Sequence, residues 1–167
     1  MSMKKSCSES RTIQTDGVLP NDTNPHQTLF GGALMSRIDR VAGIAAVKHC
    51  RKPTVTASTD SVDFLHPITL QDVVTLEAFV TWTGNTSMEV FVRVTADNLF
   101  TGESRVAATS FLTFVSLNEE GHPAPVPSVY PETEEEHYLF NTGKERSIAR
   151  KLRREQSKHL AKTFGRK

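Results

Sequence analysis

Asp39 is the residue whose setting points most directly to chemistry. It lies in the run FGGALMSRIDRVAGIAAVKH, residues 30–49, which has no proline and is apolar on nearly every side. A carboxylate in such a segment is costly to desolvate unless it is paired or has a task. At about 100° per residue, mostly small residues surround it on the helix: Gly32, Met35, Ser36, Ala42, Gly43 and Ala46. We expect Asp39 to lie in a crevice open to a partner helix or a substrate. An ion pair with an arginine from elsewhere in the chain is the alternative.

Gly31 and Gly32 stand where a loop enters the same helix. The first N–H groups of a helix have no intrahelical acceptor, and two residues without side chains leave those groups accessible to an anion. The pair therefore predicts an oxyanion site, although glycines also occur at helix starts for steric reasons alone.

The elements that must position these residues are a long helix and a set of strands. Residues 30–49 would form a helix of about 30 Å. An edge strand at residues 11–18 and a loop at 19–28 precede it, and four strands follow Pro53: residues 54–65, 74–82, 88–96 and 105–117. In the second and third of these, apolar residues alternate with polar ones, which indicates half-buried antiparallel strands. The shared faces are Val74, Leu76, Ala78, Val80 and Trp82, and Met88, Val90, Val92, Val94 and Ala96, with Gly84 and Asn85 as the turn.

One long apolar helix followed by an antiparallel meander predicts an α+β domain of the hotdog type, in which a curved sheet wraps the helix. We assign this domain to residues 1–130. From residue 131 to 167 we expect a basic helical extension, because ETEEE opens the segment and cations close it, the favourable order for the helix dipole. Its thin apolar stripe predicts that it lies on the body of the protein or on a neighbouring subunit.

Composition narrows the function classes. With 167 residues and 37% hydrophobic content, the chain suits one domain, and 20 basic against 19 acidic residues give it no overall preference for nucleic acid or an anionic membrane. Two cysteines match no zinc spacing, and no run has the length of a membrane span or the form of a signal peptide. We expect a cytoplasmic protein with no metal and no resident cofactor.

A resemblance to a known family is carried by several motifs. The run DTNPHQTLFGGALMSRID, residues 22–39, resembles the signature of the bacterial and mammalian cytosolic acyl-CoA thioesterases that include brain acyl-CoA hydrolase. The likeness continues through VTASTDSVDFLHPI at 55–68, QDVV at 71–74 and NEEGHPAPVP at 118–127. One departure is Gln27, where relatives often have glycine.

The resemblance implies hydrolysis of acyl-CoA to fatty acid and CoA, with CoA as substrate moiety and product. The motif asparagine and aspartate fall on Asn24, which would orient water or the carbonyl, and Asp39, which would be general base or nucleophile. By position in the motifs, further substrate contacts fall on Thr28, Phe30, Gly31, Gly32, Ser58 and Phe64. Gly31 and Asp39 are about 12 Å apart along one helix, so we expect sites shared across a homodimer, which relatives often assemble into hexamers.

Other readings stay open at this stage. A hydratase on the same fold would need a His with an Asp or Glu in the helix, which this helix lacks, whereas a non-catalytic acyl-CoA sensor would use Asp39 structurally. Arg93 and Arg105 are candidates for the CoA phosphate. Ten of the twenty basic residues lie at 144–167. This segment could be a solvated helix face, an arm that binds nucleic acid, or a site for the CoA phosphate, and we prefer the solvated face.

Overall fold

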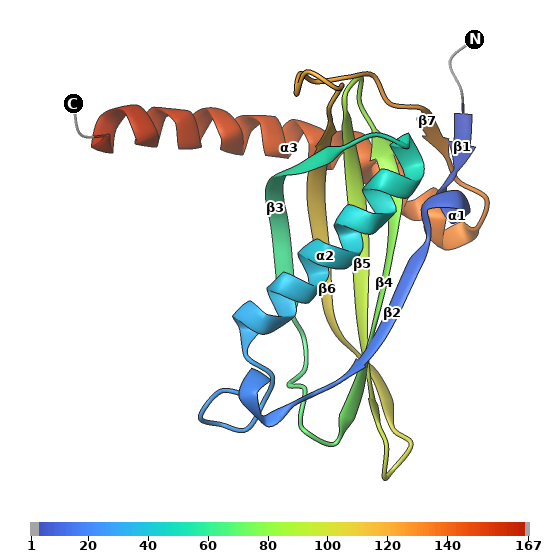
Figure 1. Ribbon diagram of the computed structural model, residues 1–167, viewed down its shortest axis with the longest axis vertical. Coiled ribbons are helices and arrows are strands. Elements are labelled where there is room, and N and C mark those ends of the chain that lie inside the picture. Colours follow the sequence, from blue (N-terminus) through green and yellow to red (C-terminus); the bar gives the residue numbers. More distant parts are fainter. Residues whose placement is uncertain (1–3, 166–167) are drawn as a thin grey trace.

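The computed structural model describes residues 4–165 and consists of one curved sheet, one long helix against it, and a second long helix that extends from the body (Figure 1). In chain order the elements are β1 (Lys4–Ser6), α1 (Cys7–Ser10), β2 (Thr12–Gly17), the 3-10 turn η1 (Pro20–Asp22), α2 (Gly31–Cys50), β3 (Thr54–Phe64), β4 (Asp72–Thr83), β5 (Ser87–Asn98), β6 (Ser104–Ser116), β7 (Ser128–Tyr130) and α3 (Glu134–Phe164).

The sheet is antiparallel with five strands in the order β2-β4-β5-β6-β3, and α2 lies across its concave face (Figure 1). A separate parallel pair joins β1 to β7 near the N-terminus. The hotdog fold predicted from the order of helix and strands is confirmed, including the edge strand before the helix and the helix at the end of the chain.

The core lies between α2 and the concave face of the sheet. The alternation of β5 is confirmed, since Met88, Val90, Val92, Val94 and Ala96 are all fully buried. The helix contributes a stripe at three- and four-residue spacing: Leu34, Ile38, Val41, Ala42, Ala45 and Ala46. Each alternating strand thus buries one apolar face against the helix, which stabilises the fold by about 25 cal/mol per Å² of apolar surface removed from water.

Trp82 departs from the predicted pattern. A register shift between Val80 and Trp82 inserts a β-bulge, so that Trp82 pairs with Glu89 on the convex face. There its ring packs on α3 at Gly143, where an added Cβ would lie 2.6 Å from Cδ1 of Trp82. The prediction that Trp82 shares the inner face with Val80 is wrong, because a bulge moves every following side chain to the other face.

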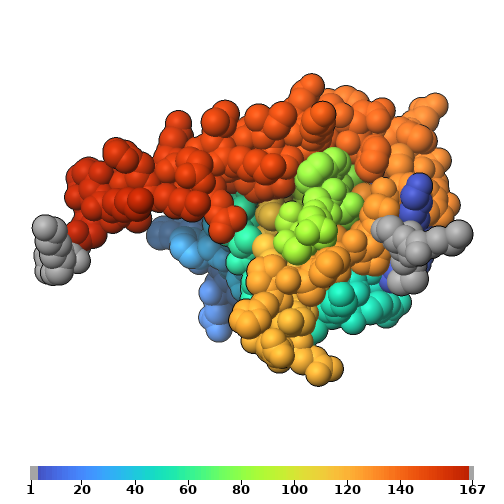
Figure 2. Space-filling view, turned by 90° about the horizontal axis from the view of Figure 1, so that it is seen from above, coloured from blue at the N-terminus to red at the C-terminus, as the bar shows by residue number. Residues whose placement is uncertain are grey.

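The first half of α3 packs on the convex face of the sheet. It begins with a capping box, in which Thr133 and Glu136 exchange side-chain and backbone hydrogen bonds, and Glu136 is buried in an ion pair of 2.7 Å with Arg11. Glu89, on the face predicted to be polar, is also buried and accepts from Arg146 of α3 at 2.8 and 3.0 Å. From residue 151 to 165 every residue is exposed, and this half projects from the body (Figure 2).

Candidate active site

Asn24 organises the loop that leads into α2. Its side-chain oxygen accepts from the backbone N–H groups of His26 (2.9 Å) and Thr28 (3.3 Å), and its amide donates to the Thr28 hydroxyl (2.9 Å). A backbone hydrogen bond from Leu29 to Ile68 ties the loop to the body, and one from Phe30 to Asp22 closes the loop on itself. Asn24 is therefore held by local bonds in one orientation, and its second amide hydrogen has no acceptor within residues 4–165, which leaves it available for a ligand.

Gln27 adopts a left-handed backbone conformation, with φ of 61°. Glycine reaches this region without steric cost, whereas a side chain pays for contact between its Cβ and the following carbonyl. The departure seen in the sequence motif therefore falls on the one loop position where the backbone favours glycine. The loop still closes, because Gln27 donates its N–H to the Asn24 carbonyl at 2.9 Å.

The N-terminus of α2 opens onto a cavity of about 350 Å³. No side chain caps this end of the helix, since the N-cap residue is Phe30 and the first turn carries no acid. The cavity is lined in part by Asn24, Thr28, Gly31 and Phe64. An added Cβ on Gly31 would lie 3.4 Å from the Phe64 ring. The structure thus gathers the predicted catalytic residue Asn24 and three predicted substrate contacts around uncapped backbone amides, where a developing negative charge is stabilised.

Asp39 lies two turns further along α2, on the side that faces the edge strand β3. Its Oδ1 accepts a hydrogen bond of 2.8 Å from the hydroxyl of Thr56 on β3. We expected Asp39 in a crevice open to a partner or a substrate, and in the single chain its side chain is exposed. Among residues 4–165 no cation pairs with it, so the alternative of a structural ion pair is not found.

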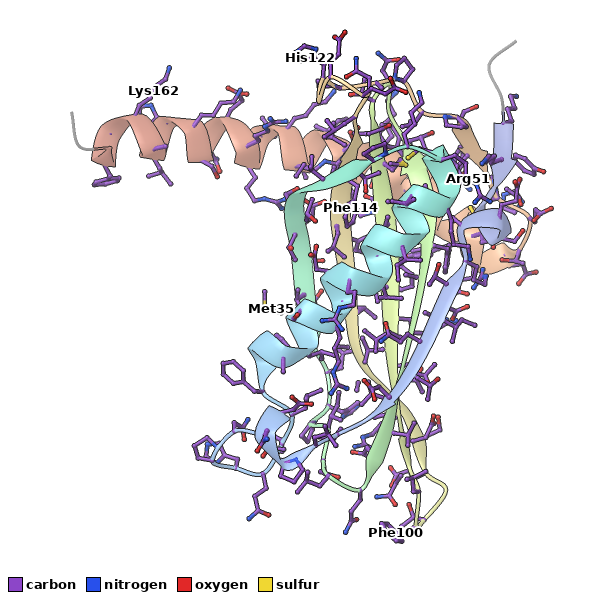
Figure 3. All side chains as sticks on the ribbon, in the orientation of Figure 1. Met35, Arg51, Phe100, Phe114, His122 and Lys162 are labelled. Carbon is purple, nitrogen blue, oxygen red and sulfur yellow. The ribbon has the colours of Figure 1, made fainter. Side chains whose placement is uncertain are left out.

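A second cavity, of about 470 Å³, begins at Asp39 and Thr56 and continues along α2. Gly43, Ile44, Val47 and Phe114 give this cavity an apolar stretch, and Arg40, Lys48 and Thr54 also line it. Phe114 points from β6 toward the helix, whereas Met35 points away from the sheet (Figure 3). Asp39 and Thr56 thus form the polar end of an apolar trough, which lacks Asn24 and the helix N-terminus.

The remaining predicted residues lie elsewhere. Phe30 and Gly32 are exposed at the start of α2, with the Phe30 ring against Gly32. Ser58 faces α3 and donates to Asp60 at 2.6 Å.

Both arginines predicted for the CoA phosphate are in ion pairs. Arg93 is paired with Glu77 and Glu135, and Arg105 binds both oxygens of Asp72 at 2.7 and 3.2 Å. A phosphate would have to displace these carboxylates.

Comparison with known proteins gives the family. A model of the thioesterase superfamily matches residues 26–99. An uncharacterized acyl-CoA thioester hydrolase of Bacillus subtilis (strain 168) is 57% identical over 159 residues, which cover 95% of this chain and 92% of that protein. The chain belongs to the acyl-CoA thioester hydrolases. This hydrolase therefore carries thioesterase activity, and the family resemblance seen in its motifs is confirmed.

Solved structures agree with this assignment. The hydrolase is similar to the acyl-CoA hydrolase of Staphylococcus aureus solved with butyryl-CoA, CoA and CoA disulfide, with a TM-score of 0.93, 45% identity, and coverage of 98% of this chain and 99% of that one. An apo-hexameric acyl-CoA thioesterase matches with a TM-score of 0.88 and 50% identity, covering 90% and 97%. Structures of the S. aureus hydrolase also include three variants in which an aspartate, a threonine or an asparagine is replaced by alanine.

Thr56 is the residue that the sequence did not reveal. It lies inside the matched strand motif, but its contact with Asp39 depends on where α2 crosses β3, which no local pattern encodes. The available signal was that Thr56 is polar although it lies on a strand face expected to pack against the helix.

Other reactive groups are not placed for catalysis. Cys7 and Cys50 are buried and unpaired, and burial raises the pKa of the Cys7 thiol to about 12, so that it stays protonated. Within residues 4–165, no three His, Cys, Asp or Glu side chains are grouped to share a metal ion. None of the helices in this range combines the length and apolarity needed to cross a membrane.

Proposed function

We propose that this enzyme hydrolyses acyl-CoA to a carboxylic acid and CoA in a site formed by two copies of the chain. One copy supplies Asn24 and the amides at Gly31 and Gly32, and its partner supplies Asp39 and Thr56. The observation that carries this proposal is the separation of the two halves within one chain. Gly31 and the Asp39 carboxylate line different cavities, and the two residues are about 12 Å apart along α2.

The chemistry divides between the two halves. The helix N-terminus polarises the thioester oxygen and stabilises the oxyanion that forms when the carbonyl is attacked. Asp39 takes a proton from water as the water oxygen bonds to the carbonyl carbon, the C–S bond then breaks, and the departing thiolate receives the proton. Asn24 orients the water or the carbonyl through its free amide hydrogen, and Thr56 holds the Asp39 carboxylate by its hydrogen bond.

Asp39 can also act as a nucleophile, which would form an acyl-aspartyl anhydride that water then opens. The two routes differ in where an oxygen label goes. In a single turnover in ¹⁸O water, the direct route leaves the label only in the fatty acid. The covalent route puts it in Asp39 when water opens the anhydride at the aspartyl carbon.

Two surfaces of the single chain support assembly. Strand β3 is an eleven-residue edge strand, largely exposed, with no neighbour on its outer side among the described residues, and such edges pair readily with another chain. Next to it, α2 exposes Met35, Ile44 and Val47 around Asp39. Pairing of two copies along these surfaces would bury Asp39 and bring the partner's amides to it. A homodimer assembling into a hexamer agrees with the hexameric relative.

The apolar trough provides a place for the acyl chain. With the thioester carbon next to Asp39 and Thr56, the chain extends along Gly43, Ile44, Val47 and Phe114, away from the polar end. Burial of each CH₂ group there contributes about 0.8 kcal/mol to binding. The residue types changed in the S. aureus variants, aspartate, threonine and asparagine, are those assigned here to Asp39, Thr56 and Asn24.

The test is hydrolysis by purified protein, followed as free thiol released from acyl-CoA of several chain lengths. We expect turnover by the wild type and loss of at least about a thousandfold in kcat for Asp39→Asn, with the oligomer unchanged by light scattering. Asp16→Asn, the same substitution at an exposed aspartate of β2 that lines neither cavity, is the control. Binding of CoA without thiol release by the wild type would instead indicate an acyl-CoA sensor.

A further inference from the structure

A buried carboxylate lies behind the wall of the Asn24 cavity. Asp72, the first residue of β4, belongs to the QDVV motif at residues 71–74, which the proposed mechanism does not use. Its side chain is 0% exposed, and it lines neither the cavity at Asn24 nor the one at Asp39. A carboxylate at such a depth is costly unless other groups pair with it.

The partners of Asp72 are an arginine and the loop that leads into its own strand. Arg105 of β6 donates to the two carboxylate oxygens at 2.7 and 3.2 Å. Thr69 donates both its backbone N–H, at 2.7 Å, and its hydroxyl, at 3.1 Å. Burial alone would raise the pKa of the Asp72 carboxyl, but these hydrogen bonds outweigh burial and hold the pKa below its usual value. Asp72 is therefore ionised and joins Thr69 to Arg105.

The segment that Asp72 holds is the loop between β3 and β4, residues 65–71. Arg105 also donates to the carbonyl of Pro67 at 2.9 Å, so the ion pair fixes this loop at both Pro67 and Thr69. Part of the loop lines the cavity at Asn24: Leu65, His66, Pro67 and Ile68. The ion pair thus supports one wall of that cavity from behind.

The same loop is bonded to the loop that carries Asn24. Thr69 forms an antiparallel backbone bridge with Thr28, and Leu29 donates its N–H to the Ile68 carbonyl at 2.7 Å. Figure 1 shows the two loops, in blue and green, next to each other at the lower end of the sheet. The position of Thr28 therefore follows the position of Thr69.

Thr28 connects this bridge to the asparagine assigned to catalysis. Its hydroxyl accepts from the Asn24 amide at 2.9 Å, and its backbone N–H donates to the Asn24 side-chain oxygen at 3.3 Å. We propose that Asp72 is a positioning residue for hydrolysis, which through Thr69 and Thr28 holds the Asn24 side chain in the orientation that the reaction needs. Arg105 fixes the Asp72 carboxylate in this role. The inference rests on the proposed function of Asn24.

A carboxylate that only stabilises the fold would give a different result from a positioning residue. Asp72→Asn keeps the shape of the side chain and removes its charge, so both roles predict some loss of stability. Only a positioning role requires that the effect on turnover depend on the Asn24 side chain. Residues that act through one shared contact have non-additive effects, whereas independent effects multiply.

The test is a double-mutant cycle in the full chain, with Asp72→Asn and Asn24→Ala made singly and together and thiol release measured from butyryl-CoA. We expect Asp72→Asn alone to lower kcat about tenfold and to keep KM within about twofold of the wild type. On the Asn24→Ala background, in single turnovers with enzyme in excess, it should lower the rate by less than about twofold.

Asp97→Asn is the matched control for the loss of a charge near Arg105. The Asp97 carboxylate also acts on Arg105 by its charge, but among the described residues it accepts no hydrogen bond from the loop at 65–71. Its kcat should stay within about twofold of the wild type.

Two further variants keep the test decisive. If Asp72→Asn does not fold, Thr69→Val removes the hydroxyl that donates to Asp72 at 3.1 Å, keeps the backbone bridge, and should lower kcat about threefold with the same dependence on Asn24. If Asn24→Ala has no rate above the uncatalysed reaction, Thr28→Val takes its place in the cycle.

The outcomes separate this inference from the proposed function. Equal fractional losses from Asp72→Asn on both backgrounds, with urea unfolding showing folded proteins, would overturn the positioning role and leave the role of Asn24 intact. A wild-type kcat for Asn24→Ala would instead overturn the proposed role of Asn24, and the positioning role of Asp72 with it.

Discussion

The hydrogen bond between Thr56 and Asp39 gives a prediction whose size follows from the structure. Thr56→Val keeps the shape of the side chain and removes only the hydroxyl that donates to Oδ1 of Asp39 at 2.8 Å. A hydrogen bond to a charged group contributes about 1.5–3 kcal/mol, and each 1.4 kcal/mol is about a factor of ten in rate. If the bond holds the carboxylate in its reactive position, kcat should fall by about ten- to a hundredfold.

The assay is thiol release from butyryl-CoA at saturating substrate, with kcat and KM determined separately. Thr59→Val is the matched control, because Thr59 is on the same strand, is exposed and has no hydrogen-bond partner for its hydroxyl among the described residues. Circular dichroism and light scattering should show both variants folded and assembled as the wild type. Equal kcat values for the two variants would refute the assignment of Thr56 as the group that positions Asp39.

Three further predictions follow from other contacts. Gly43→Val should reduce kcat/KM for dodecanoyl-CoA at least about tenfold relative to butyryl-CoA, because a side chain there enters the trough. The control, Gly43→Ala, adds a Cβ 3.6 Å from Phe114 and should keep the wild-type ratio of the two kcat/KM values. A wild-type ratio for Gly43→Val would show that the acyl chain binds elsewhere. Gln27→Gly should raise the free energy of unfolding in urea by about 1 kcal/mol, because glycine adopts the φ of 61° at this position without steric cost. A free energy of unfolding below that of the wild type would contradict backbone strain at Gln27. Burial lowers the pKa of His49 below 6.5, and its Nε2 lies 2.9 Å from the Pro127 carbonyl. Because the pKa of His49 is lower in the folded than in the unfolded chain, its neutral ring contributes stability above the unfolded pKa, and this stability is lost as the pH falls. The free energy of unfolding should therefore decline below pH 6.5, and His49→Gln should lack that part of the decline. An identical slope in the variant would exclude His49 as its source.

Much of the fold could be predicted because its pattern is local. The inner faces of β4 and β5 alternate with period two, and α2 is apolar without interruption, so each element specifies its own class and one buried face. Trp82 escaped this reasoning because a bulge changes the period without changing the composition of the strand. The burial of Glu89 escaped it because the covering arginine, Arg146, is more than fifty residues away along the chain.

The site could be predicted only in part. Asn24, Thr28, Gly31 and Phe64 gather around one cavity, as the motif implied. Asp39 was expected in a crevice and does line a cavity beside β3, but sequence alone does not say whether a small-residue stripe meets the same chain or another. The partner of Asp39, Thr56, depends on a helix–strand crossing, and the engagement of Arg93 and Arg105 by carboxylates depends on cross-strand register.

The shared site is tested most directly by mixing two inactive variants, Asn24→Ala and Asp39→Ala. A mixed pair has one site with both lesions and one site with neither, provided that Asn24 and Asp39 act from different subunits. Equal, random mixing by refolding or co-expression should then restore about one quarter of the wild-type rate of thiol release. If both residues act within one chain, no intact site can form, and a mixture with no more activity than either variant alone would contradict the account.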